Sequence, residues 1–339
     1  ALPSPGRLPV PESRPHPESG RVRYRKTLPM PHPGSAEALV HTIDEALNLL
    51  RDYRTMQHSD GVPAQPLPTL LEQCEAALAA IPGPAPLRSV HHFASTGGTL
   101  ICKALNTLPN TVLLSEIDPL SEMTPSVLPK MPFRPTDLIF ALRNGIRPVE
   151  QDVVKETFAA AVMAAREGVE RFGQHLILRD HAHSQFCRDG VDFDARPTLR
   201  EMLGDRIDLL SVVTVRHPLD SFLSLDANGW VHFSPGTLDA YAVRYLAFLD
   251  RHEGLPVVRY EDFVAAPEAS LERLCTILDL VPTPLAFDVL PAIRLSGDSG
   301  RNEGPIAPRP RRPVPDAIDA ERYRSQSYQI LCTRLEYEP

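Results

Sequence analysis

A short stretch of small and hydroxyl residues follows an apolar run and precedes an expected helix, in the sequence HHFASTGGTLICKAL at residues 91–105. A glycine-bearing turn at a helix N-terminus binds anions, because its free N–H groups and the helix dipole both point at the ligand. The phosphate loop of nucleoside triphosphatases, GxxxxGK[ST], has a lysine directly after its last glycine, and this stretch has none at that position. We therefore predict a phosphate-binding loop of another kind. Its residues are Ser95, Thr96, Gly97, Gly98, Thr99 and Leu100.

A second cluster with binding chemistry is VVTVRHPLDSFLSL, at residues 212–225. Arg216 follows an apolar strand pattern, and Pro218 suits the first position of a helix. Ser224 lies eight residues after Arg216. An arginine and a hydroxyl that converge at a strand end can bind a phosphate monoester. The alternative is an arginine that caps the sheet edge and a serine that faces solvent, and the motif alone does not decide between them.

Two further clusters lie closer to the C-terminus. Tyr260, in VVRYEDF, follows the last expected strand, and an acidic pair there precedes a helix. The stretch 295–315 has no helical or strand period, but it contains Ser299 and a run of arginines that ends at Arg312. A basic loop in an acidic protein is a candidate lid over an anion. The alternative for this stretch is an unstructured connector.

The elements that must position these clusters begin after Pro86, where short apolar runs alternate with longer helical patterns. This alternation predicts an α/β domain with a mostly parallel sheet. Ligands of such sheets bind at the carboxyl ends of the strands, where the clusters fall. The expected strands are 88–93, 111–114, 175–179, 209–215 and 255–260, and the expected helices include 151–173, 219–227, 237–251 and 269–278.

The N-terminal part of the chain has a different composition. Residues 1–34 hold nine prolines and almost no apolar periodicity, which predicts an extended arm. Residues 35–82 contain two helical patterns separated by a proline-rich turn, with Ser35 as the expected N-cap of the first. This helical extension either packs on the main domain or serves a partner. The α/β domain itself is expected at 87–339.

Composition excludes several classes of protein. The 339 residues are 42% apolar and 23% charged, as in ordinary globular proteins, and the net charge of −8 argues against an extended nucleic-acid surface. No apolar run approaches the ~18 residues of a membrane helix, and the N-terminus lacks the apolar core of a signal peptide. The five cysteines show no metal-ligand spacing, which predicts no metal and a reducing, cytoplasmic setting. The many arginines, alanines and prolines indicate a GC-rich bacterial genome.

Taken together, the four clusters resemble the sulfotransferases that use 3′-phosphoadenosine 5′-phosphosulfate, over about residues 87–315. The resemblance implies a P-loop-like, three-layer α/β fold. It also implies that the loop binds the 5′-phosphosulfate and that Arg216 and Ser224 bind the 3′-phosphate, with Tyr260 near the nucleotide. The implied reaction is the metal-independent transfer of a sulfuryl group to an acceptor hydroxyl.

Within the family, the sequence resembles the tyrosylprotein sulfotransferases and related bacterial enzymes. That branch has a catalytic glutamate about twenty residues after its loop, and the resemblance assigns this role to Glu116. Its basic residue at the end of the next strand corresponds to Arg179 in LILRDH. Its late serine and basic residue, thirteen positions apart, correspond to Ser299 and Arg312.

One position departs from the family. Its members usually begin the loop with arginine or lysine, whereas Ser95 stands at that position here. The 5′ end of the donor must therefore find positive charge elsewhere. We expect Arg179 to supply it, and Lys103 is a weaker second candidate because it lies one turn into the helix.

The roles of some residues and the function itself keep alternatives. Glu116 is the expected general base, and the histidines His181 and His183 compete for that role. A rival function is a nucleotide-binding or scaffold protein that lost activity with the loop cation. A kinase with a degenerate loop is disfavoured, because a phosphate-binding lysine and a Mg²⁺-binding carboxylate motif are both lacking. The acceptor remains open among tyrosine, sugar, lipid and secondary-metabolite hydroxyls, and so does the oligomeric state.

Overall fold

The computed structural model describes residues 36–56, 69–80, 85–123, 137–144, 147, 149–204, 206–296 and 306–339. The chain divides into two compact units, residues 1–81 and residues 82–339, and each is considered by itself. The expected arm at 1–34, the expected N-cap Ser35 and the expected ligand Ser299 lie outside the described residues.

The first unit contains the two helices that the apolar periodicity predicts, α1 (Ala36–Met56) and α2 (Leu70–Ala80). Thr69 and Glu72 start α2 with a reciprocal cap, because the Glu72 carboxylate accepts from the Thr69 amide and the Thr69 hydroxyl accepts from the Glu72 amide. Within the described part of the chain, no helix is long and apolar enough to cross a membrane.

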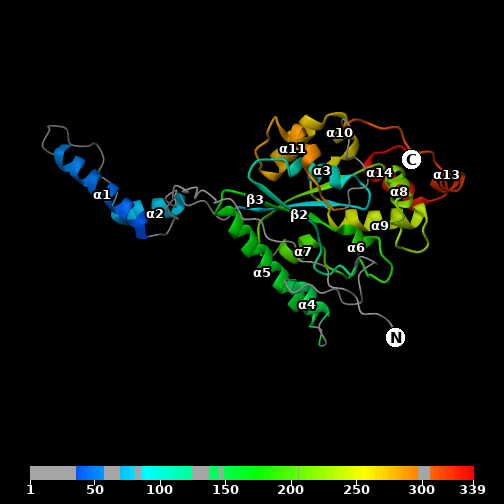
Figure 1. The fold of residues 1–339 in the computed structure, drawn as a ribbon, viewed down its shortest axis with the longest axis horizontal. Coiled ribbons are helices and arrows are strands. Elements are labelled where there is room, and N and C mark those ends of the chain that lie inside the picture. The colour runs from blue at the N-terminus through cyan, green and yellow to red at the C-terminus, as the bar shows by residue number, and fades with distance from the viewer. Residues whose placement is uncertain are drawn as a thin grey trace, which may run out of the picture. The chain divides into compact units, whose positions relative to one another are not determined.

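A five-stranded parallel sheet forms the centre of the second unit, in the order β2-β3-β1-β4-β5 (Figure 1). The strands are β1 (Leu87–His92), β2 (Thr111–Ile117), β3 (His175–Asp180), β4 (Leu209–Val215) and β5 (Val257–Arg259). Strands β2 and β3 lie on one side of β1, and β4 and β5 lie on the other side. The switch point of the topology is therefore beside the carboxyl end of β1. Open parallel sheets bind ligands at this place. The α/β fold class predicted from the sequence is confirmed.

Helices cover both faces of this sheet in three layers, because its strands carry apolar side chains on both sides (Figure 1). In β4, for example, Val212 packs against the helices of one face and Val213 against those of the other. The first face carries α3 (Gly98–Leu105), α10 (Tyr260–Ala265) and α11 (Pro267–Leu278), and the second carries α5 (Gln151–Glu170), α6 (Ala182–Phe186), α7 (Leu199–Gly204) and α9 (Leu238–Arg251).

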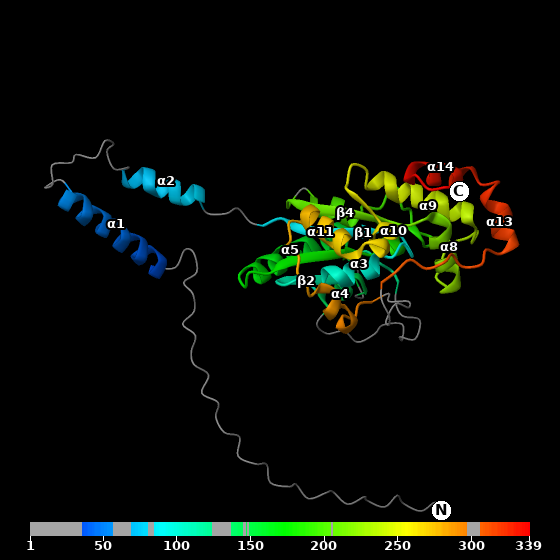
Figure 2. The same cartoon turned by 90° about the horizontal axis from the view of Figure 1, so that it is seen from above.

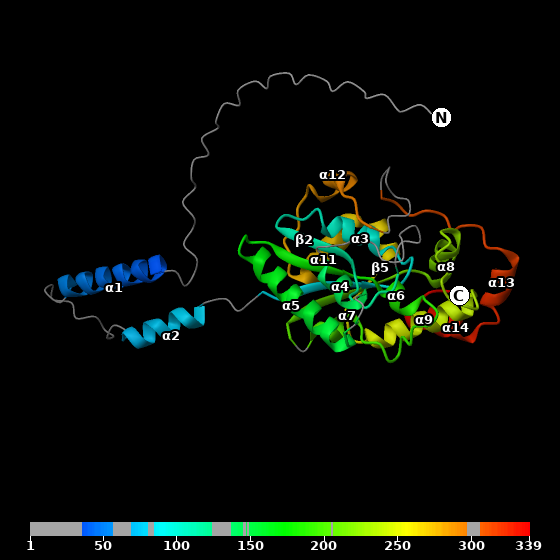
Figure 3. The same ribbon diagram turned by 60° about the horizontal axis from the view of Figure 1, so that its bottom comes forward.

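The C-terminal segment returns to the second face. Figures 2 and 3 show it beside α8 and α9, where Tyr328 and Leu331 join the apolar cluster of Tyr241. These C-terminal helices add to those that the sequence patterns predict. The elements not yet named are α4 (Leu138–Asn144), α8 (Pro218–Ala227), α12 (Ala286–Val289), the 3₁₀ helix η1 (Leu290–Ala292), α13 (Asp316–Arg322) and α14 (Gln326–Leu335).

Candidate active site

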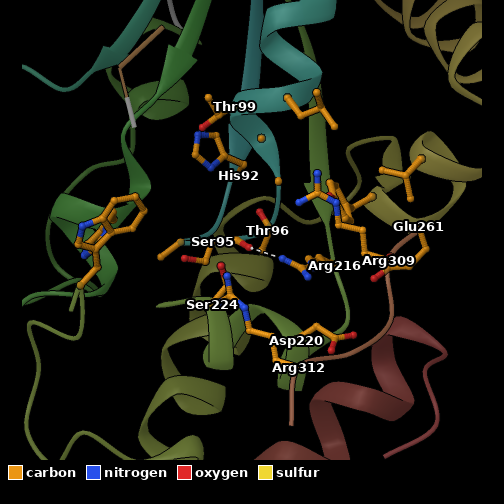
Figure 4. A pocket seen from close by; sticks show the side chains of 18 of the residues that line it. His92, Ser95, Thr96, Thr99, Arg216, Asp220, Ser224, Glu261, Arg309 and Arg312 are labelled. Atoms are coloured by element: carbon orange, nitrogen blue, oxygen red, sulfur yellow. Dashed lines mark hydrogen bonds between the residues drawn. The ribbon is translucent and has the colours of Figure 1, made fainter. Parts of the chain in front are cut away.

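The sequence-predicted site residues that the structure describes all line one pocket of about 800 Å³ (Figure 4). They come from the β1–α3 loop, the ends of β2 and β3, the start of α8, the start of α10 and the segment before α13. They are Ser95, Thr96, Gly97, Gly98, Thr99, Leu100, Glu116, Arg179, His181, Arg216, Ser224, Tyr260 and Arg312.

The β1–α3 loop turns sharply to start α3. Ser95 and Gly97 both have positive φ, 62° and 84°, so the backbone turns towards α3 over three residues. Thr96 closes this turn, because its amide and its hydroxyl both donate to the carbonyl of Phe93. The Thr96 side chain is buried and thus holds the loop in shape. Leu100 N–H donates to Gly97 O and begins the helix.

Two aromatic rings lie directly on the two glycines of this loop. A Cβ atom on Gly97 would lie 2.1 Å from Cδ2 of Tyr260, and a Cβ atom on Gly98 would lie 2.3 Å from Cγ of His92. Both distances are far below van der Waals contact. The glycines are therefore required by close packing as well as by the positive φ of Gly97.

Alanine at either glycine should destabilise the fold by more than ~1 kcal/mol, since a ring or the loop must move. Thermal unfolding measures the effect. Gly168→Ala in α5 is the matched control, because its Cβ meets nothing within 4 Å. This control should stabilise the protein by ~0.5–1 kcal/mol. An unchanged unfolding temperature of Gly98→Ala would contradict the close packing at this loop.

Arg179 ends β3 and is almost fully buried, at 2% exposure. Its Nε donates to Nε2 of His92 at 2.9 Å, and its Nη2 donates to Oγ1 of Thr99 at 2.8 Å. Its Nη1 donates to Oγ of Ser115 and to the carbonyl of Ser296, both at 2.9 Å. The guanidinium therefore joins the loop, the ends of three strands and the segment after η1.

Glu116 completes the partners of Arg179, with Oε1 3.4 Å from Nη2. The register of β2 against β3 shifts between Leu114 and Ile117, and Glu116 has a positive φ of 58°. Consecutive residues of a regular strand point to opposite faces, whereas a bulge re-aims one of them. The irregularity thus lets Ser115 and Glu116 both contact Arg179. A non-glycine residue at positive φ costs about 1–3 kcal/mol, a cost typical of functional sites.

His92 is neutral in this arrangement. Because Arg179 Nε only donates, Nε2 of His92 must accept, and Nδ1 carries the proton that it shares with Phe93 O. Burial, together with the charge of Arg179, lowers the pKa of His92 to about 3. The structure places His92 in the pocket and His91 in the interior.

Arg216 leaves β4 beside the loop. Its guanidinium lies over the ring of Tyr260, 4.9 Å from the centroid, and donates to Ser95 O at 3.5 Å (Figure 4). Helix α9 contacts both the loop and Arg216 through hydrogen bonds of two tyrosines. Tyr241 Oη donates to the carbonyl of Ala94, and Tyr245 Oη accepts from the Arg216 amide.

The segment after residue 306 runs beside α8 and adds arginines to the same wall (Figures 2 and 4). Arg312 donates to the carbonyl of Leu223, and Arg311 pairs with Asp220 at 2.9 Å. Arg309 lines the pocket as well. These contacts fit the expected basic cover over an anion.

Sequence reasoning missed several lining residues. The carboxylates of Asp220 and Glu261 stand among the arginines, and Glu261 accepts from the His217 amide and from the hydroxyl of Tyr337. The place of Asp220 in the first turn of the helix that follows Arg216 could have indicated the first. Other lining residues follow no motif, and Met123, Trp230 and His232 are among them.

The competing bases share the pocket, whereas only one of the two competing cations lines it. Glu116, His181 and His183 all line the pocket, and burial lowers the pKa of His183 to about 3. Lys103 is buried in α3 and does not line the pocket, whereas Arg179 does. Of the two candidate cations, only Arg179 is therefore in place to contact a ligand.

Fold and pocket together define a parallel α/β protein with a glycine-containing loop at the start of its first core helix. No family model and no curated protein sequence matches the chain.

Several solved structures are similar to the chain. The sulfotransferase domain of the Synechococcus PCC 7002 olefin synthase is 15% identical with a TM-score of 0.47, covering 77% of this chain and 98% of that domain. The sulfotransferase domain of the curacin biosynthetic pathway is 16% identical with a TM-score of 0.43, covering 76% and 99%. A sulfotransferase from Alicyclobacillus acidocaldarius is 16% identical with a TM-score of 0.35, covering 61% and 90%. At such identities the functional proposal rests on the residues of this chain.

Proposed function

We propose that the protein is a sulfotransferase that moves a sulfuryl group from 3′-phosphoadenosine 5′-phosphosulfate to an acceptor hydroxyl. One observation carries the proposal. The glycine loop, the Arg216–Ser224 pair and the Arg179–Glu116 pair come from distant parts of the sequence, and they line one pocket at the switch point of the sheet.

The donor would bind along the loop. The start of α3, with Thr99, holds the 5′ end, because a helix N-terminus offers N–H groups and a positive dipole to an anion. Arg216 and Ser224 hold the 3′-phosphate on the side of α8, and Arg312 covers it. Tyr260, which lies against Gly97 and under Arg216, supports the nucleotide between the two ends.

The transfer is an in-line displacement at sulfur. Glu116 accepts the proton of the acceptor hydroxyl, and the acceptor oxygen forms the new S–O bond. The S–O bond to the 5′-phosphate breaks, and its electron pair moves to the phosphate oxygen. Arg179 stabilises that growing charge from a buried position, where an ionic contact is stronger than in water. Arg179 thereby supplies the charge that Ser95 lacks.

The direct test is calorimetric titration with 3′-phosphoadenosine 5′-phosphate, with and without Mg²⁺. We expect binding in both conditions. Arg216→Ala should weaken it by ~1.5–3 kcal/mol, the scale of a charge-assisted hydrogen bond, and should hardly affect adenosine 5′-phosphosulfate, which lacks the 3′-phosphate.

Arg259→Ala is the matched control for Arg216→Ala. Arg259 ends the neighbouring strand and also lies over a tyrosine ring, 5.1 Å from the centroid of Tyr337, but it does not line the pocket. Its loss should leave both affinities unchanged. Equal losses for the two ligands in Arg216→Ala would remove Arg216 from the 3′-phosphate site.

One observation favours a second candidate, a nucleotide-binding protein without transferase activity. Ser95 brings no charge to the loop, and its buried Oγ has no hydrogen-bond partner. Tight nucleotide binding without transfer to any acceptor would support this candidate. Binding of ATP that requires Mg²⁺ would instead support a kinase.

The finer parts of the proposal are the relation to the tyrosylprotein branch and the cytoplasmic setting. The first rests on the spacing of Glu116 and Arg179 from the loop. The second agrees with the cysteines, since Cys74 is exposed, the other four are buried and all five are unpaired. A screen of hydroxyl acceptors with labelled donor identifies the acceptor class.

A further inference from the structure

A buried cluster of ionisable side chains lies outside the pocket. His91 belongs to β1, Asp180 ends β3 and His252 follows the last residue of α9. The side chains are 0%, 8% and 0% exposed, and none of the three lines the pocket. One ring nitrogen of each histidine and one carboxylate oxygen of Asp180 lie within 4.8 Å of one another.

The hydrogen bonds of His252 fix its tautomer. Nδ1 lies 2.8 Å from the carbonyl oxygen of Phe248, and because a carbonyl only accepts, Nδ1 carries the hydrogen. Nε2 of the neutral ring then bears a lone pair. It has no hydrogen-bond partner, and Oδ2 of Asp180 lies 3.9 Å away. Two acceptors thus face each other in a buried place, which is unfavourable unless a positive charge lies between them.

His91 is held in the same manner. Its Nδ1 lies 2.9 Å from Oδ2 of Asp180, and its Nε2 lies 3.0 Å from Oγ of Ser89, which contacts Oγ of Ser211 at 2.8 Å. In metal sites the second ring nitrogen of a histidine ligand usually donates to a carbonyl, carboxylate or water, which orients the ring. Both histidines of this cluster have at that nitrogen an oxygen atom that can accept a hydrogen bond.

We propose that His91, Asp180 and His252 bind one divalent metal ion, with zinc as the best fit. Two imidazoles and a carboxylate, with a water molecule as the fourth ligand, are a ligand set of zinc in proteins. Ligands about 2.0–2.1 Å from a tetrahedral ion lie about 3.3 Å from one another. The two separations from Oδ2, 2.9 Å and 3.9 Å, lie on either side of this value. Small rotations of the three side chains would therefore form the site.

The ion would have a structural role. His91 precedes His92 in the chain, and Asp180 follows Arg179, so the site would fix the strand ends that present these two pocket residues. It would also join α9 to both strands. The proposal is independent of the proposed function, because it needs no nucleotide and no turnover.

Metal analysis of the full chain tests the proposal. The protein is purified without chelator from medium containing zinc, and its metal content is measured by mass spectrometry. We expect about one zinc per chain in the wild type, and less than a tenth of that in Asp180→Asn and His252→Gln. His232→Gln, an exposed histidine of the pocket, is the control and should retain the metal.

A second measurement allows for the burial of the site, which slows exchange in the folded protein. Wild type is unfolded in denaturant with chelator and refolded with Zn²⁺, with Co²⁺ or without metal. Zn²⁺ should raise the unfolding temperature of the wild type and of His232→Gln. Co²⁺ should give the visible absorption of a tetrahedral site. Neither effect should appear in His252→Gln.

The absence of a metal site would also be visible in these measurements. Wild type that contains no metal as purified, and that refolds to the same unfolding temperature with and without Zn²⁺ or Co²⁺, would overturn the proposal. The cluster would then be a metal-free network in which Asp180 contacts His91 at hydrogen-bond distance and Nε2 of His252 stays without a partner. Equal metal content in wild type and Asp180→Asn would also overturn it. If a variant fails to fold, the metal content and the refolding of the wild type alone decide whether the cluster binds a metal ion.

Discussion

Glu116→Gln should bind nucleotide normally and transfer sulfuryl groups at least ~10²-fold more slowly, as expected for the loss of a general base. Glutamine keeps the shape of the side chain but accepts no proton at neutral pH. The rate is measured with labelled donor and two acceptors, an aliphatic alcohol and a nitrophenol. The nitrophenol has a low pKa and needs less help to lose its proton, so its defect should be smaller.

Glu170→Gln is a close control for this variant. Glu170 is 23% exposed and pairs with a buried arginine, Arg166, much as Glu116 is 24% exposed and pairs with Arg179. Glu170 does not line the pocket, so its variant should show the stability cost of the lost pair without a rate defect. Ordinary turnover of Glu116→Gln on the alcohol would assign the base to His181.

Arg179→Ala should lower turnover far more than nucleotide affinity, because its contact strengthens as the leaving phosphate gains charge. The same substitution leaves Glu116 unpaired and removes the donor from His92. Breaking a buried ion pair from one side typically costs ~3–5 kcal/mol, so unfolding must be measured in parallel with kcat and affinity.

Arg166→Ala separates the two effects, since Arg166 is also buried and ion-paired but lies away from the pocket. It should lose stability and retain kcat. Adding Ser95→Arg to Arg179→Ala, which restores the loop cation of the resembling family, should recover part of the rate. Near-normal turnover of Arg179→Ala with saturating acceptor would show that the missing charge is not supplied by Arg179.

The elements of the α/β unit could be predicted well from the sequence, because buried parallel strands are nearly continuous apolar runs. All five expected strands are present, and the clusters that follow them meet at one edge. The order of the strands could not be predicted, since it depends on how helices such as α5 and α11 pack across the sheet. The C-terminal helices α13 and α14 have weaker patterns and are held by contacts with α8 and α9.

The site was predictable where residues belong to a motif and unpredictable where only the fold joins them. The loop and Arg216 have local signatures. The bulge that brings Ser115 and Glu116 to the same guanidinium has none, because it depends on the pairing of β2 with β3. The expectation of no metal rested on spacing along the chain, which does not reveal that the ends of β1 and β3 meet the end of α9.

Helix α9 supports the loop through Tyr241, Arg216 through Tyr245 and the buried cluster through His252. These three regions therefore share one rigid support, although nothing in the sequence connects them. Local unfolding of a protein occurs in contiguous cooperative units. The amides of the loop, of the start of α8 and of α9 should thus exchange their hydrogens together, as one unit whose opening removes the whole proposed nucleotide site at once.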